Sequence, residues 1–244
     1  MTKSIPFDTV LFRDDFRGFP AGHIHRDSTA RGEYMAMVVP ANPNGWYHNG
    51  NFGNRTPDKE HSPFRVIETE SGRRMEMSDR GRCPLVMLTT GPKCWSDMKL
   101  ATTVSVDDVV PVGLSVRYET NRDCYGAIVE SGVFKLVRVF EGLIAVLDSS
   151  PVRVEAGVPV PMTLQADGDR ITATGFGVTL SATDGCIRTG GFGLWAEGKG
   201  SFGEVVVTCP AGELGRIRSA EQEDAVRVGK KRLAYPPMEL VAEI

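Results

Sequence analysis

The segment Gly45–Arg55, which reads GWYHNGNFGNR, gathers aromatic and planar polar side chains in one short stretch. Sugars are bound by flat apolar rings that pack against their C–H surfaces and by planar polar groups that bond their hydroxyls. This composition predicts sugar contact. The alternative is a loop whose Trp packs against the edge of the predicted β-sandwich and whose Asn–Gly pairs only form turns. The predicted substrate-binding side chains here are Trp46, Tyr47, Asn51 and Arg55.

All four histidines of the chain lie in the first quarter of the sequence. His23 and His25 are two residues apart, so both would point to one side of an extended segment. With a third ligand they could hold zinc, or one histidine could act as a general base. His25 and His48 are the candidate bases, and surface histidines without a catalytic part are the alternative.

A second group of candidates lies on neighbouring predicted strands. In Gly113–Glu119 (GLSVRYE), period-two alternation predicts Tyr118 on one face and Arg117 on the other. If Arg117 faces the open side of the sheet, it could line a groove with Tyr125 or Lys135. Such a groove would accept an anionic sugar such as a uronate, because a guanidinium binds a carboxylate through two hydrogen bonds. The alternative is an exposed polar sheet face.

Trp195 and Glu197 (LWAEG) share one face by strand alternation, which would place an aromatic platform beside a carboxylate. Two interpretations remain open. The pair could contact a glycan, or Trp195 could be a core residue near the rim of the fold.

These candidates lie among many short predicted strands. Between Cys83 and Cys209 the sequence alternates polar and apolar residues, and two-residue links such as Ser131–Gly132 and Glu141–Gly142 predict tight antiparallel hairpins. Glycine and proline are abundant, at 27 and 15 of 244 residues. This pattern predicts an all-β chain folded as a sandwich or jelly roll.

Composition excludes several functional classes. The chain has 28 Lys and Arg against 31 Asp and Glu, a net charge of −3, which argues against a nucleic-acid partner held by a basic field. No run approaches the roughly 18 apolar residues of a membrane span. Five scattered cysteines without a Cys-x-x-Cys pair exclude a full disulfide framework. The start of the chain resembles no secretory leader, so a cytoplasmic location is expected, with secretion as the alternative if a leader has been removed.

The two ends of the chain differ from the middle. Residues 17–63 are rich in Gly, Pro, Asn and aromatics, which predicts a long loop region over the sandwich. We expect a sandwich over 1–210 and an extension over 211–244. Glu213–Leu233 has acids first and bases last, which favours a short helix. Met238–Ile244 is either a docking strand or the start of a further domain, and could support a homo-oligomer.

The strand-and-turn pattern of Val10–Thr208 resembles the concanavalin A-like lectin/glucanase superfamily, in particular laminin-G-type and family-16-glycosidase-like modules. The matching pieces are LFRDDF, GLSVRYETNRDCYGAIVESGVFKLVRV, DGDRITATGFGVTLS and GGFGLWAEGKGSFGEVVVT. The resemblance implies an antiparallel jelly-roll sandwich that recognises carbohydrate. It also implies neighbouring first and last strands that hold a structural calcium ion, and no organic cofactor. The calcium ligands would be Asp14, Asp15 and Glu204.

The chain departs from the catalytic patterns of such enzymes. The Glu-x-Asp-x-Glu strand of family-16 glucanases is absent, as are the Gln-Ile-His and Tyr-Phe-Lys motifs of jelly-roll alginate lyases. The leading prediction is therefore a carbohydrate-recognising protein that acts in or beside a polysaccharide-degradation system. The alternative is a lyase or hydrolase acting on a uronate-containing glycan, with His25, His48, Arg117 and Tyr125 as its catalytic residues.

Overall fold

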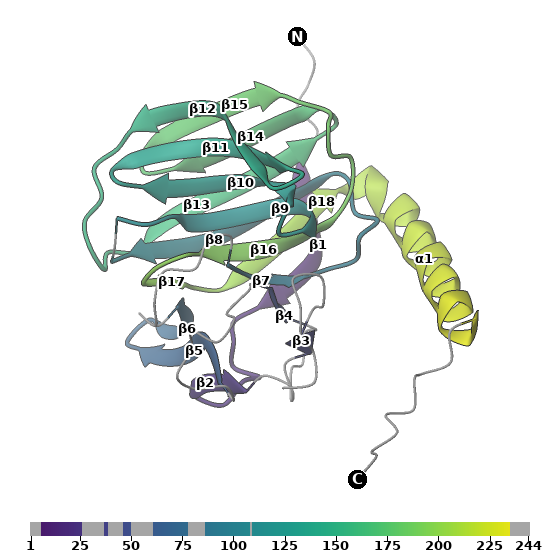
Figure 1. The fold of residues 1–244 in the computed structure, drawn as a ribbon, viewed down its shortest axis with the longest axis horizontal. Helices are drawn as coiled ribbons and strands as arrows, with labels where there is room; N and C mark the ends of the chain where they lie inside the picture. Colours follow the sequence, from purple (N-terminus) through teal and green to yellow (C-terminus); the bar gives the residue numbers. More distant parts are fainter. Residues whose placement is uncertain are drawn as a thin grey trace.

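The computed structural model describes residues 6–25, 37–38, 46–49, 61–77, 86–107 and 109–234. Two antiparallel sheets pack face to face, which confirms the predicted all-β jelly-roll sandwich (Figure 1). Sheet A follows the order β15 (Val178–Thr183), β14 (Arg170–Gly175), β13 (Val160–Asp167), β8 (Met98–Val106), β17 (Gly200–Phe202), β6 (Gly72–Met77), β5 (His61–Thr69) and β2 (Gly22–His25), and β18 (Val205–Pro210) links β8 to β1 (Phe7–Asp14). Sheet B follows the order β12 (Leu143–Pro151), β11 (Val133–Phe140), β10 (Asp123–Glu130), β9 (Val112–Thr120), β16 (Gly191–Ala196), β7 (Met87–Thr90), β4 (Tyr47–Asn49) and β3 (Met37–Val38).

The predicted hairpin links are confirmed. Ser131 and Gly132 have φ values of 50° and 73°, and Glu141 and Gly142 have 52° and 83°. Two consecutive residues with positive φ form a turn whose twist matches that of the paired strands. In the meander β9–β10–β11–β12, two-residue turns therefore join β10 to β11 and β11 to β12.

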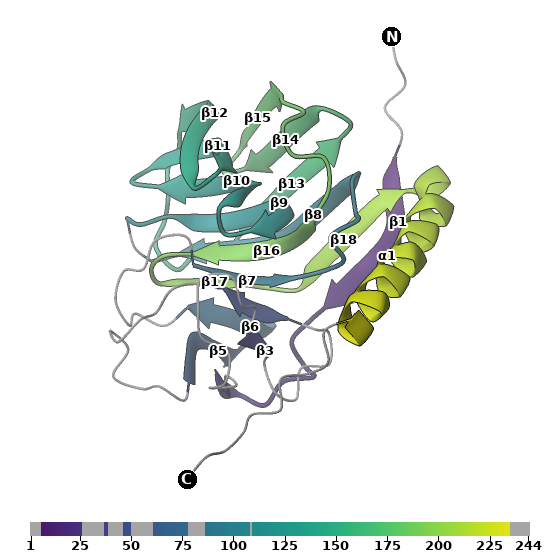
Figure 2. The ribbon, with the colours of Figure 1, turned by 45° about the vertical axis from the view of Figure 1, so that its right-hand side comes forward.

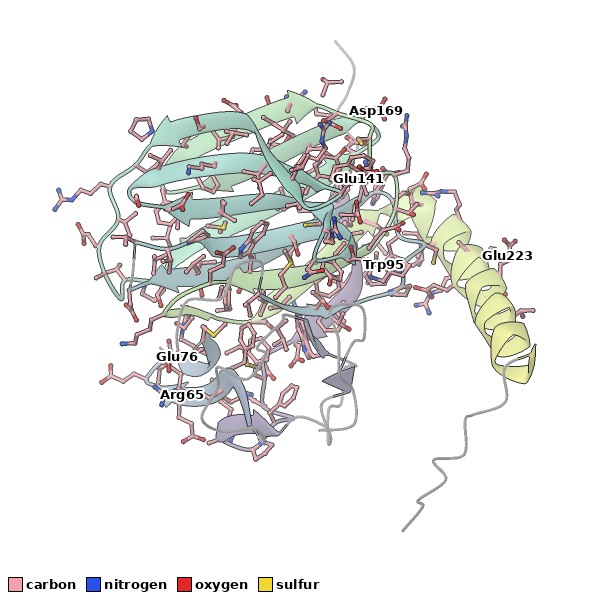
Figure 3. The ribbon with its side chains drawn as sticks, viewed as in Figure 1. Arg65, Glu76, Trp95, Glu141, Asp169 and Glu223 are labelled. Atoms are coloured by element: carbon pink, nitrogen blue, oxygen red, sulfur yellow. The ribbon has the colours of Figure 1, made fainter. Side chains whose placement is uncertain are left out.

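The predicted loop region over 17–63 contains short strands, and a hairpin begins at its end. β5 and β6 form a hairpin whose strands are joined by an ion pair between Arg65 and Glu76 (Figure 3). A second ion pair joins Arg73 to Glu68. Short strands β2 and β4 extend sheets A and B.

The main core between the sheets contains an aromatic cluster. The ring centroids of Trp46 and Phe12 lie 5.6 Å apart, and Trp95 stacks on Phe192 at 6.0 Å. Trp46 also packs against Phe16 and Phe192. This cluster fills the sandwich beside β1.

A helix follows the last strand and covers nearly the span Glu213–Leu233 in which a helix was predicted. The short turn η2 (Ala211–Glu213) leads into α1 (Leu214–Ala234), which lies on one side of the sandwich (Figure 2). Ile217 is 1% exposed and joins the main core, and Trp95 Nε1 donates to Glu221 Oε1 at 2.7 Å. Within the described residues no helix is long and apolar enough to cross a membrane. Met238–Ile244 lies outside them.

Candidate functional site

Sheet B has a second hydrophobic cluster on the face turned away from the core. On β16, Leu194 and Ala196 belong to the main core, whereas Trp195 between them belongs to the second cluster. Trp195 is therefore buried, at 0% exposure, on the outer face of sheet B. We call this group the outer-face cluster; it consists of Met87, Tyr118, Cys124, Ile128, Val137, Val139 and Trp195.

Glycines on β9 and β10 lie beside Trp195, and the glycine on β10 leaves room for its indole. Gly113 is the register partner of Trp195 on β9, and a Cβ at Gly113 would lie 1.9 Å from the Ala127 carbonyl oxygen. A Cβ at Gly126 on β10 would lie 2.8 Å from Trp195 Cζ3. The indole thus crosses β9 and rests on β10, where any side chain would displace it. Its Nε1 donates to Glu197 Oε1 at 2.9 Å, so the predicted Trp195–Glu197 pair exists.

Two buried hydroxyls on this face lack hydrogen-bond partners. Ser115 is 0% exposed and Tyr118 is 3% exposed, and neither Ser115 Oγ nor the Tyr118 hydroxyl makes a hydrogen bond. Thr89 contacts the Tyr118 phenol without hydrogen-bond geometry. Burial raises the pKa of Tyr118, so its phenol stays protonated and can donate. Because an unpaired buried polar group is destabilising by about 1–3 kcal/mol, a ligand that pairs with both hydroxyls would gain affinity.

Gly193 brings the hydroxyl-bearing positions together. A Cβ at Gly193 would lie 2.7 Å from Thr89 Cγ2 and 2.9 Å from Ser115 Oγ, so these two side chains converge over the glycine from β7 and β9. Because Gly193 has no side chain, the β16 backbone between Thr89 on β7 and Ser115 on β9 is left uncovered by any side chain of its own at this position.

Lys93 places a cation at the edge of the same group. Its Nζ lies 4.4 Å from the centroid of the Tyr118 ring and donates to the Tyr118 carbonyl oxygen at 3.0 Å and to the Glu119 carbonyl oxygen. Desolvation lowers the pKa of Lys93 to about 8, against the opposing attraction of Glu119 and Cys124. Lys135, a predicted binding residue, also belongs to the outer face, but its Nζ pairs with Glu130 Oε2 at 2.5 Å.

Arg117 does not line an open groove, contrary to the sequence prediction. Its side chain is 1% exposed and donates to the carbonyl oxygens of Ser96 at 2.9 Å, Ile187 at 3.0 Å and Gly168 at 2.6 Å. It also lies 3.5 Å from Asp97 Oδ1. With its donors used inside the protein, this guanidinium holds loops together and has none exposed for a uronate.

Arg117 also changes the register of its strand. Its φ is +48°, and the ladder between β9 and β16 skips this residue, pairing Tyr118 with Gly191 and Val116 with Phe192. This β-bulge turns Tyr118 onto the same face as Ser115, whereas uninterrupted alternation would place them on opposite faces.

Tyr125 is likewise a structural residue rather than an accessible base. Its buried hydroxyl donates to Asp184 Oδ1 at 2.7 Å and accepts from the Ile187 backbone N–H at 3.2 Å. Desolvation is the main cause that raises the pKa of Tyr125 to about 12. Arg138 Nη1 binds the second oxygen of Asp184 at 2.5 Å. Together these contacts hold the crossing segment that precedes β16.

Trp46 does not form a sugar platform in this structure. It is 0% exposed in the main core, and its Nε1 donates to Asp14 Oδ2 at 2.7 Å. Trp46 and Trp195 therefore lie on opposite faces of sheet B.

For the other predicted residues of the N-terminal region, the structure gives the strand and the backbone register partner. Tyr47 pairs with Thr89 and His48 with Leu88 in sheet B, whereas His25 pairs with His61 in sheet A. The two candidate bases thus belong to different sheets. Asn51 and Arg55 lie outside the described residues.

The predicted calcium ligands are engaged by protein groups. β1 and β18 are neighbours, as expected. However, Asp14 accepts hydrogen bonds at both oxygens, from the Phe16 backbone N–H and from Trp46. Asp15 pairs with Arg17, and Glu204 with Arg13. Within the described part of the chain, no group of three or more His, Cys, Asp or Glu side chains is arranged to hold a metal ion.

Sequence reasoning missed the polar residues of the outer face. Ser115, Tyr118 and Thr89 have unremarkable types and spacing in short strands, and Lys93 follows a Gly–Pro pair. The one available signal was the glycine content of three adjacent strands, at Gly113, Gly126 and Gly193, which indicates that something lies close against the sheet.

Comparison with solved structures supports a β-sandwich of the carbohydrate-binding-module and galectin-like type. The chain is similar to the carbohydrate-binding module CBM66 from Bacillus subtilis, with a TM-score of 0.52 and 18% identity over 68% of this chain and 96% of that module. It is also similar to a protein of unknown function with a galectin-like fold from Bacillus subtilis, with a TM-score of 0.51 and 10% identity over 84% of this chain and 98% of that one. No protein-family model and no curated protein matches the sequence. At these identities the likeness establishes the fold alone.

Proposed function

We propose that this protein binds a saccharide on the outer face of sheet B, next to Trp195 and Tyr118. One observation carries the proposal. Ser115 Oγ and the Tyr118 hydroxyl are buried without partners on a face that also bears an indole and an ammonium group. A sugar could supply the hydrogen-bond partners that these two hydroxyls lack, because sugar hydroxyls both donate and accept.

The scaffold is consistent with this role. One of the similar folds is a carbohydrate-binding module, and a module of that kind would act in or beside a polysaccharide-degradation system. A concanavalin A-like ancestry is the finer form of the same proposal. Fold alone does not determine function, so the proposal depends on the residues of the outer face.

The charges of the face favour a neutral, hydroxyl-rich saccharide. Arg117 is engaged with carbonyl oxygens, and Lys135 is paired with Glu130. Lys93 already donates to two carbonyl oxygens. A uronate would therefore find few cationic donors that are not already bonded within the protein, and an anionic ligand is the less favoured class.

The test is binding to a panel of neutral and anionic oligosaccharides by isothermal titration calorimetry. Ser115→Ala and Tyr118→Phe each remove one unpaired hydroxyl, and Ser149→Ala, at an exposed position on β12, is the matched control. We expect each of the first two variants to bind about 2- to 10-fold more weakly, from the loss of about 0.5–1.5 kcal/mol per hydrogen bond.

Thermal unfolding separates binding from structure. Because the two hydroxyls are unpaired in the free protein, their removal should leave the melting temperature unchanged or higher. The proposal fails if the wild-type protein binds no saccharide of the panel, or if Ser115→Ala binds as well as Ser149→Ala.

A further inference from the structure

The edge strand β12 exposes an uncharged apolar segment. Among the described strands, β12 forms a ladder only with β11, so the other side of its backbone has no strand partner. The segment 143–147 reads LIAVL and contains no charged residue or proline. Edge strands in soluble proteins are usually protected by charge, proline or cover, because their free N–H and C=O groups recruit other strands.

The exposed side chains lie on both faces of this edge. Ile144 and Val146 are 52% and 55% exposed and pair with Val139 and Val137, which belong to the outer-face cluster. Leu143 is 77% exposed and pairs with Phe140, which is 40% exposed. This pair lies on the other face of the sheet, because side chains alternate along a strand. A helix or a ligand that packs on one face would leave the other exposed. A strand that adds to the edge brings side chains beside the exposed residues on both faces.

The sequence of the segment favours a second copy of the same chain as that strand. In an antiparallel pair with its two-fold axis at Ala145, Ile144 would face the Val146 of the other copy, and Leu143 would face Leu147. Every facing pair is apolar, and no like charges oppose each other. The second half of β12 is less available, because Asp148 Oδ2 accepts a hydrogen bond from the Ser181 backbone N–H of β15 at 2.9 Å.

We propose that two copies of this protein associate through antiparallel pairing of their β12 edges, centred on Ala145. The association joins the two B sheets into one continuous sheet. It also gives the exposed apolar residues of each copy apolar neighbours from the other copy on both faces.

The oligomeric state tests this proposal. Sedimentation equilibrium of the full chain over a concentration series should show a monomer–dimer equilibrium. Val146→Lys should raise the dimer dissociation constant by about 10-fold or more, since each dimer then places two ammonium groups in an apolar seam. Val158→Lys is the matched control, because Val158 is 46% exposed in a turn away from β12, and it should leave the dimer unchanged. Both substituted positions are exposed, and circular dichroism verifies that the variants fold.

A charge pair tests the register. Ile144→Lys alone should weaken the dimer, and the double variant Ile144→Lys/Val146→Glu should restore it, because each introduced lysine then faces an introduced glutamate of the other copy. A wild-type protein that stays monomeric at every concentration overturns the proposal, as does equal weakening by Val146→Lys and Val158→Lys. A double variant no stronger than Ile144→Lys overturns the register centred on Ala145.

Discussion

Replacement of Arg117 by methionine should destabilise the fold strongly, because the guanidinium connects three loops. Arg117 donates to the carbonyl oxygens of Ser96, Ile187 and Gly168 at 2.6–3.0 Å and lies 3.5 Å from Asp97 Oδ1. Breaking a buried ion pair by removing one partner typically destabilises by about 3–5 kcal/mol, and the orphaned carbonyl groups act in the same direction. We therefore expect Arg117→Met to lower the free energy of unfolding by about 3–5 kcal/mol.

Urea unfolding followed by circular dichroism measures this change. For a protein of this size, 1 kcal/mol corresponds to a shift of about 2–4 °C, so the melting temperature should fall by roughly 6–20 °C. Arg153→Met is the control, because the Arg153 side chain is 88% exposed beside Glu155 and should contribute less than about 1 kcal/mol. If Arg117→Met unfolds within about 1 kcal/mol of Arg153→Met, the structural role is refuted. If it instead abolishes saccharide binding at unchanged stability, Arg117 is a ligand contact.

Three further outcomes follow from the packing. Gly126→Ala should destabilise by about 1–3 kcal/mol in thermal unfolding, because its Cβ would lie 2.8 Å from the Trp195 ring, whereas Gly212→Ala, with nothing within 4 Å, should change stability by less than about 0.5 kcal/mol. Ile217→Ala should lower the free energy of unfolding by about 2–5 kcal/mol and speed hydrogen exchange in α1, and unchanged exchange would contradict the docking of the helix. Tyr125→Phe probes pH dependence: a phenol whose pKa is raised from about 10 to about 12 stabilises the fold fully below pH 10 and loses that contribution as the pH rises towards 12. Urea titrations should show the wild-type advantage over Tyr125→Phe shrinking across that interval, and a constant difference would contradict it.

The strands of the second half of the chain were predictable because each of them alternates. Val133–Phe140, the segment between the two predicted links, forms β11, and the links at Ser131–Gly132 and Glu141–Gly142 have positive φ as a tight hairpin requires. Cys124 and Cys209 lie in strands of this part of the chain and are both buried with free thiols. These features depend on neighbours a few residues away, which is the range that a sequence pattern contains.

The β5–β6 hairpin was missed because its charges obscure the alternation. Arg74 is buried yet charged, since its guanidinium binds Ser201 Oγ at 2.8 Å and Thr103 Oγ1 at 3.0 Å across sheet A. A charged residue normally predicts an exposed position, and its partners here lie on strands distant in the sequence.

The site was predicted poorly because burial of its candidates depends on long-range contacts. Trp46 lies between Asn–Gly turns in the sequence, but its indole bonds Asp14, which is 32 positions away. The β-bulge at Arg117 moves Tyr118 to the opposite face from the one that alternation predicts. Neither effect leaves a signal within a short window of sequence.

The pairing of β1 with β18 affects how the chain is made in the cell. Phe7 pairs with Pro210 and Asp14 with Val205. β1 is the first of the described strands to leave the ribosome, and its partner β18 is the last of them. During translation Phe7–Asp14 therefore has no β18 partner until the other described strands have been synthesised. The fold can therefore close at this seam only after Val205–Pro210 has left the ribosome, and a nascent chain stalled before Val205 would present an open edge to chaperones.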